Sequence, residues 1–180
     1  IGAVGPTGRG VCEELGVDVA DITVMMGTFT KSFGAAGGYV AGSREVVDAV
    51  KRFSLGYTEA VSMAPAVCAQ VLSSLRIISG DDGTDVGKEK LIALRENSKF
   101  FRDGLIALGL EVLGDDPSPI MPVMLYQPYK IGDFSRLAFN RGLAVVVVGS
   151  PATPVTLPRV RFCISAAHKK KDLELSLIHI

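Results

Sequence analysis

The stretch Met26-Gly-Thr-Phe-Thr-Lys-Ser-Phe-Gly-Ala-Ala-Gly-Gly-Tyr39 decides the fold of this 180-residue chain. The apolar run Ile22–Met26 leads into it, and such a run is typical of a strand buried on both faces of a parallel sheet. Lys31 follows that strand, at the end where α/β folds place their ligand sites. A second short strand is predicted over Tyr39–Ala41. The stretch therefore predicts an α/β protein with a ligand site around Lys31.

The neighbours of Lys31 favour a functional role, although a lone lysine is most often a solvated side chain. Thr28 and Thr30 supply hydroxyls that can hold a phosphate. Three glycines allow the backbone to approach a ligand closely, namely Gly34, Gly37 and Gly38. A desolvated lysine loses its proton more readily and can attack an aldehyde cofactor. We therefore expect Lys31 to be desolvated and nucleophilic.

Outward from this stretch, short strands alternate with helices, which indicates a layered α/β architecture. The clearest helical pattern is a 3, 4, 3, 4, 3 spacing of Leu91, Leu94, Ser98, Phe101, Leu105 and Leu108. This long helix, with Gly109 just past its end, is predicted to connect a large domain to a smaller C-terminal domain. We also expect a glycine-rich loop at 2–10, helices at 11–15, after Ser43, at 64–78 and at 134–141, and strands at 120–125, 143–148 and 160–165.

The composition excludes several classes of function. Basic and acidic residues number 19 each, so the formal net charge is zero, and we expect no nucleic-acid binding. The three cysteines are far apart and the two histidines are isolated, which gives neither a disulfide framework nor a metal site. No apolar stretch approaches the roughly 18–20 residues that cross a bilayer. Membrane contact is expected only through regions outside this sequence.

Both ends of the sequence resemble interruptions of a longer protein. The chain starts without Met in a glycine-rich run and shows no signal or transit character. Residues 175–180 continue no earlier pattern and match a translated sequencing adapter, so we expect a non-native tail; a short apolar strand is the alternative. We expect residues 1–83 to end a large domain, and 84–174 to form the connecting helix and a small α/β domain.

Three segments, in order along the chain, resemble the α-oxoamine synthases, which are pyridoxal-phosphate enzymes with the aspartate-aminotransferase fold (fold type I). Thr28-Phe-Thr-Lys-Ser-Phe-Gly34, followed by Gly37-Gly-Tyr39, resembles the cofactor-lysine motif of that family. Residues 2–10 resemble the run that follows the family's Asp-x-Ala-His segment. Arg159-Val-Arg-Phe-Cys-Ile-Ser165 resembles its C-terminal arginine strand. The likeness covers nearly all of residues 1–174.

The resemblance implies roles for individual residues. Lys31 would form the Schiff base with pyridoxal 5'-phosphate and later move a proton, and Thr28 would contact the cofactor phosphate. Arg161 would bind the amino-acid carboxylate, which a guanidinium grips bidentately; an ordinary strand arginine is the alternative. The segment that contacts the phosphate from the neighbouring subunit usually reads Ser/Thr-Ser-x-Pro-Pro. Here it is Glu59-Ala-Val-Ser-Met-Ala-Pro65, which keeps one hydroxyl, Ser62.

Within the family, the lysine segment and Gly149-Ser-Pro-Ala-Thr-Pro154 look most like the branch that condenses L-serine with a long-chain acyl-CoA, such as palmitoyl-CoA, to a 3-keto sphingoid base. The alternatives are a synthase that uses glycine or alanine, and a non-catalytic subunit, against which Lys31, Thr28 and Arg161 weigh. The resemblance implies a homodimer, or a heterodimer with a homologous non-catalytic subunit. It places the enzyme at the cytosolic face of the endoplasmic reticulum in a eukaryote, and otherwise in the cytoplasm. Since the family's ring-nitrogen Asp and ring-packing His would precede Ile1, we expect the 180 residues alone to be inactive.

Overall fold

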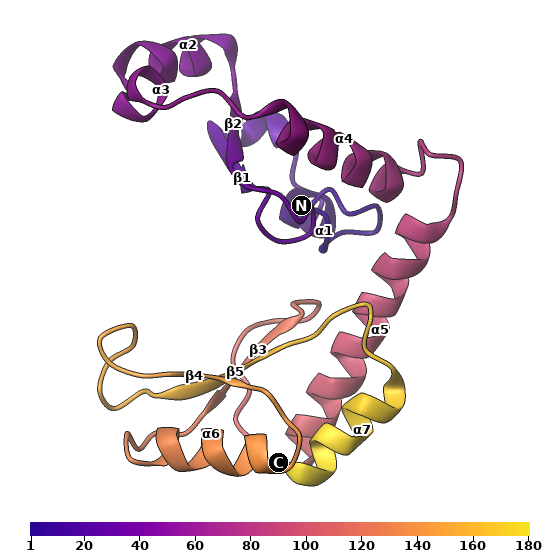
Figure 1. Ribbon diagram of the computed structural model, residues 1–180, viewed down its shortest axis with the longest axis vertical. Helices are drawn as coiled ribbons and strands as arrows, with labels where there is room; N and C mark the ends of the chain where they lie inside the picture. The colour runs from indigo at the N-terminus through magenta and orange to yellow at the C-terminus, as the bar shows by residue number, and fades with distance from the viewer. The chain divides into compact units, whose positions relative to one another are not determined.

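The computed structural model describes residues 1–180 and divides into two compact units, residues 1–91 and 92–180 (Figure 1). The division falls inside the long helix α5 (Val86–Ala107), slightly beyond the boundary expected between residues 83 and 84. None of the helices combines the length and the apolar character that spanning a bilayer requires.

The first unit combines a two-stranded hairpin with helices. Strand β1 (Val24–Thr28) pairs antiparallel with β2 (Gly38–Gly42), with Thr28 opposite Gly38. The other elements of this unit are α1 (Val11–Leu15), the 3-10 helix η1 (Val19–Asp21), α2 (Arg44–Phe53), α3 (Leu55–Glu59) and α4 (Pro65–Ser79). The predicted glycine-rich loop and the predicted helices at 11–15, after Ser43 and at 64–78 are present; η1 and α3 were not predicted.

The strand expected to be buried in a parallel sheet differs from that expectation. Strand β1 begins at Val24, and its one partner, β2, runs antiparallel. The side chains of Val24 and Met26 are 50% and 73% exposed. Burial on both faces requires neighbouring strands and covering layers, and the 180 residues provide only β2 beside β1. The prediction of a strand was therefore right, and the prediction of its parallel, buried environment was wrong for this chain.

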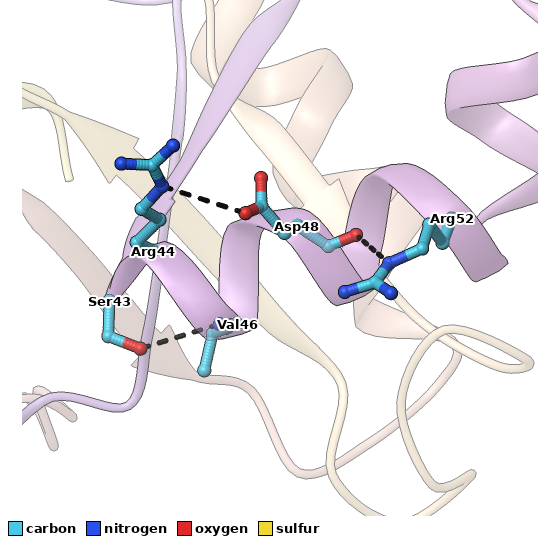
Figure 2. Close-up of polar contacts among 5 residues, drawn as sticks. All are labelled: Ser43, Arg44, Val46, Asp48 and Arg52. Atoms are coloured by element: carbon cyan, nitrogen blue, oxygen red, sulfur yellow. Dashed lines mark hydrogen bonds and ion pairs between the residues drawn. The ribbon is translucent and has the colours of Figure 1, made fainter.

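Helix α2 shows how local sequence sets an element (Figure 2). The Ser43 hydroxyl accepts a hydrogen bond from the Val46 backbone N–H at 3.4 Å, as an N-cap side chain does. Arg44 and Asp48 form an ion pair one turn apart, and Arg52 Nε donates to the Asp48 carbonyl at 3.3 Å. The Ser43 cap explains why the helix begins where the sequence predicts, and the other two contacts link residues one turn apart within it.

The second unit packs helices on a three-stranded antiparallel sheet of order β3-β5-β4. Besides the rest of α5, its elements are β3 (Ile120–Met124), α6 (Lys130–Asn140), β4 (Val146–Val148), β5 (Arg159–Cys163) and α7 (Lys170–His179). Alternate strand residues point into the core. The fully packed core side chains are Phe101, Leu105, Met121, Val123, Val160, Phe162 and Leu173.

The predicted periodicity of the long helix is confirmed where the helix meets this core. Ser98, Phe101 and Leu105 are buried, whereas Leu108 lies past the end of α5 and is 54% exposed. Strand β4 begins at Val146, three residues later than position 143, where the sequence predicts it. The last residues were expected to continue no pattern, or to form a strand; residues 170–179 instead form helix α7, and Leu177 and Ile180 pack against the core.

Candidate active site

Lys31 lies in the connection between β1 and β2. The Gly34 N–H donates to the Lys31 carbonyl at 3.1 Å, which closes a tight turn around the lysine. The same connection is tied at its base, where the Phe29 N–H donates to the Gly37 carbonyl at 2.9 Å. Gly34 has a φ of +58°, in the left-handed region that favours glycine. Its backbone conformation is therefore part of what shapes the turn.

The hydroxyls of Thr28 and Thr30 form a pair beside this turn. Their oxygens lie 2.8 Å apart, and Thr28 Oγ1 also accepts from the Thr30 backbone N–H at 3.2 Å. The Thr28 hydroxyl reaches the Gly37 carbonyl at 3.3 Å, which is long for an O–H donor. When Thr28 donates to Thr30, the hydroxyl hydrogen of Thr30 is left for another acceptor. The pair can thus offer one donor to an anionic oxygen near Lys31.

The Lys31 side chain is exposed, and no hydrogen bond or ion pair holds its amine. The expectation of a desolvated lysine is not met by these 180 residues. The backbone beneath it is anchored instead by Phe33, which is 1% exposed and packs edge-on against Phe29 with ring centroids 5.3 Å apart. The backbone of the turn is therefore anchored, while the Lys31 amine has no bonding partner.

A hollow of about 750 Å³ lies between the hairpin and helices α2 and α3. Thr28 is on its wall, and its other lining residues include Met26, Tyr39, Val40, Val47, Val50, Lys51 and Tyr57. Neither Lys31 nor Ser62 lines it. The hollow thus meets the candidate site only at the threonine end, and its side chains are mainly apolar, as in many ligand sites.

Ser62 lies in the extended segment between α3 and α4, where it is exposed and makes no hydrogen bond to Thr28 or Lys31. Its neighbour Met63 does approach the turn: a Cβ placed on Gly37 would come within 3.2 Å of the Met63 methyl carbon. The structure therefore pairs the hydroxyls of Thr28 and Thr30 at the start of the turn that carries Lys31, and leaves the Ser62 hydroxyl outside that turn.

Arg161 belongs to the second unit. It lies in the middle of β5, opposite Pro122 of β3 and Val146 of β4. Its sequence neighbours Val160 and Phe162 are buried, so the alternation of the strand directs Arg161 to the open face, where it is exposed. The guanidinium is accordingly available to a ligand on that face.

His168 has a structural role. Its Nδ1 accepts from the Ser165 N–H at 3.2 Å, and its carbonyl accepts from Asn97 Nδ2 at 2.9 Å. The first bond closes the loop after β5, and the second ties that loop to helix α5. His168 is therefore a loop-fixing residue.

The family model for aminotransferase class I and II matches residues 4–180. The chain belongs to the aminotransferase class I and II family. Long chain base biosynthesis protein 2d of Oryza sativa subsp. japonica is 55% identical over 173 residues, which are 96% of this chain and 35% of that protein. Serine palmitoyltransferase 2 of Dictyostelium discoideum is 48% identical over 180 residues, or 100% of this chain and 37% of that protein.

Solved structures with the aminotransferase-family fold superpose on this chain. The serine palmitoyltransferase of Sphingomonas wittichii superposes with a TM-score of 0.86 at 28% identity, over 99% of this chain and 43% of that one. A structure described as SPT with PLP in the internal aldimine gives 0.86 at 29%, over 99% and 44%. The predicted fold class and the predicted resemblance are confirmed. The chain spans about a third of the length of the curated relatives it matches.

Three polar residues of this aminotransferase-family chain act around the site without having been predicted. On α4, Gln70 Nε2 and Ser74 Oγ both donate to the Phe33 carbonyl, each at 3.1 Å. Their spacing of four residues places them on one helix face, which was the only sequence signal. In the glycine-rich loop, the Glu13 carboxylate accepts from the backbone N–H groups of Thr7 and Arg9.

Glu13 is a titratable group near the site whose pKa the fold lowers. The Thr7 hydroxyl donates to its carboxylate and, with the backbone N–H groups of Arg9 and Thr7, lowers the pKa of Glu13 below its ordinary value, against a smaller effect of desolvation. The loop it organises reaches the lysine turn, because a Cβ on Gly2 would lie 2.5 Å from Ser32 Cβ. Glu13 thus holds a loop that packs against the residue after Lys31.

Proposed function

We propose that the protein containing this chain is a pyridoxal-phosphate-dependent acyltransferase that condenses L-serine with a long-chain acyl-CoA, such as palmitoyl-CoA. The products would be a 3-keto sphingoid base, CO2 and CoA. The observation that carries the proposal is the free amine of Lys31 beside the paired hydroxyls of Thr28 and Thr30. It occurs in a chain 48–55% identical to relatives named for long-chain base biosynthesis and serine palmitoyl transfer.

The chemistry of these groups fits pyridoxal phosphate. Its aldehyde requires a primary amine, which Lys31 supplies, and its phosphate requires donors, which the Thr28–Thr30 pair supplies. Close approach of a phosphate to backbone is eased by the glycines at Gly34 and Gly37. When bound, the cofactor withdraws the electrons left behind as a bond to the substrate Cα breaks.

The residues of the chain would divide the remaining work. The Lys31 amine would hold the aldehyde and, once the amine of serine has replaced it, would move the proton at Cα. Thr28 and Thr30 would hold the phosphate through hydrogen bonds strengthened by its charge. Arg161 would bind the serine carboxylate bidentately, which selects the bond to Cα that breaks. Ser62 would serve the phosphate of a neighbouring subunit.

Assembly with a homologous subunit, either a copy or a non-catalytic relative, is part of this proposal. The segment from the end of α2 to the start of α4 exposes large apolar side chains, including Phe53, Leu55 and Val61. Several large apolar side chains exposed in one short segment are typical of an interface. The same segment carries Ser62, so its cover by another subunit would bring that hydroxyl to a second site.

The experiment that tests the substrate pair is an assay of CoA release by the purified protein with pyridoxal phosphate. L-serine with palmitoyl-CoA should give turnover, and serine alone or palmitoyl-CoA alone should not. Lys31→Ala should abolish turnover, whereas the matched control Lys88→Ala, an exposed lysine of α5, should not. Turnover with glycine or alanine in place of serine would assign the protein to another α-oxoamine synthase. Full activity of Lys31→Ala would refute the proposal.

A further inference from the structure

Two side chains of helix α4 donate hydrogen bonds to the backbone of the lysine turn, residues 31–34. Gln70 Nε2 and Ser74 Oγ each donate to the Phe33 carbonyl oxygen at 3.1 Å. Gln70 Nε2 also donates to Ser74 Oγ at 3.3 Å, so the three groups form a closed network. Both lone pairs of the carbonyl and both hydrogens of the Gln70 amide are used. Gln70 lies 37 positions from Phe33 along the chain, and Ser74 lies 41 positions from it. These hydrogen bonds are therefore tertiary contacts that local sequence does not impose.

The Phe33 carbonyl belongs to the peptide plane that closes the turn. Because a peptide unit is planar, the Phe33 carbonyl and the Gly34 N–H move as one body. That N–H donates to the Lys31 carbonyl at 3.1 Å. Rotation of the plane would therefore break the bond that shapes the backbone of Lys31.

Gly34 lowers the free-energy cost of rotating this peptide plane. It holds a φ of +58°, and with no Cβ it can also adopt other backbone conformations at little cost. The Phe33 ring is buried and limits movement of its Cα, but it does not fix the orientation of the peptide plane that follows. The two donors of α4 supply the constraint that the glycine lacks.

We propose that Gln70 and Ser74 are positioning residues that fix the Phe33–Gly34 peptide plane and thereby the direction in which Lys31 presents its amine. They touch neither the amine nor the hydroxyls of Thr28 and Thr30, so they act through the turn. The proposal deepens the proposed function and rests on it to the extent that Lys31 is the reactive amine. Its structural part, the fixing of the peptide plane, stands without any ligand.

The test uses Ser74→Ala and Gln70→Met in the full protein, with two readouts. The first is hydrogen exchange of the Gly34 amide, resolved from that of α4. The second is the dissociation constant for pyridoxal phosphate, followed by borohydride fixation to Lys31. Each variant loses one donor to the carbonyl, so we expect roughly a two- to tenfold rise in both quantities. Ser74→Thr, which keeps the hydroxyl, should restore both, and Ser73→Ala, an exposed hydroxyl on the same helix, should change neither.

The outcomes separate the two proposals. If borohydride fixes no cofactor to Lys31 in the wild type, the proposed function fails. Hydrogen exchange of the Gly34 amide then still decides whether Gln70 and Ser74 fix the peptide plane. If Ser74→Ala and Gln70→Met lower only the melting temperature, with Gly34 exchange and cofactor binding unchanged in the folded protein, the two residues merely stabilise α4 and the inference is overturned. Should Gln70→Met fail to fold, Ser74→Ala, which removes a single oxygen atom, gives the decision.

Discussion

Replacing Thr28 or Thr30 by valine removes one hydroxyl while the side chain keeps its shape. In the structure the two oxygens lie 2.8 Å apart, and Thr28 Oγ1 also accepts from the Thr30 N–H at 3.2 Å. Either change therefore disrupts the pair as well as removing a direct contact. A hydrogen bond to a charged phosphate contributes on the order of 1.5–3 kcal/mol. We expect each variant to bind pyridoxal phosphate about tenfold to a hundredfold more weakly.

The assay is a titration of the visible absorbance with pyridoxal phosphate. Thr84→Val is the matched control, because this exposed hydroxyl donates only to Asp82 in the loop between α4 and α5. Since the two threonines act as one unit, the double variant should lose less than the sum of the single losses. Unchanged affinity in both single variants, or strict additivity in the double variant, would refute the reasoning that the pair acts together on the phosphate.

Further predictions concern a substrate contact, a titrating group and the core. Arg161→Ala should weaken serine binding about tenfold to a hundredfold while cofactor binding survives, as serine titrations of the cofactor spectrum would measure, because a charge-assisted pair is lost. Glu13→Gln should destabilise the fold at neutral pH, and the deficit should shrink as the pH falls below 4.5, since a group whose pKa is lowered on folding stabilises only while it is ionised. Urea unfolding at several pH values would measure this deficit. Leu105→Ala should lower the free energy of unfolding by about 2–5 kcal/mol, because Leu105 is fully buried, whereas Leu108→Ala should change it by less than about 0.5 kcal/mol.

Each of these predictions has a contrary result. Serine affinity unchanged in Arg161→Ala would make Arg161 an ordinary strand residue. A stability deficit of Glu13→Gln that stays constant or grows on acidification would contradict the sign derived from the hydrogen bonds of Thr7 and Arg9. Equal losses at Leu105 and Leu108 would show that the packing of α5 differs from the one described.

The elements that the sequence predicts well are those set by local contacts. Ser43 begins α2 through a hydrogen bond to a residue three positions away, and the spacing of Phe101 and Leu105 reports one face of α5. The last part of helix α7 was missed because residues 175–180 were expected to be a non-native tail. Their helical form is supported by Leu177 packing against a distant core, and the sequence of α7 has little amphipathic pattern.

The site was predicted in part for the same reason. Lys31, Thr28 and Thr30 lie within four positions of one another, so their chemistry was visible in the sequence. The hydrogen bonds from Gln70 and Ser74 to Phe33 were not visible in the sequence, because their acceptor is a backbone carbonyl that any residue could supply. The environment of the lysine was also misjudged: an apolar strand indicates burial, but burial depends on which chains cover the strand.

The central claim is that Lys31 is the amine that reacts with the cofactor, and reductive labelling tests it most directly. The purified protein would be incubated with pyridoxal phosphate, reduced with borohydride, digested and mapped by mass spectrometry. We predict a pyridoxyl group on Lys31 that is lost in Lys31→Ala and retained in the control variants Lys88→Ala and Ser73→Ala. A stable label on another lysine, or no label on Lys31 in the folded protein, would contradict the account.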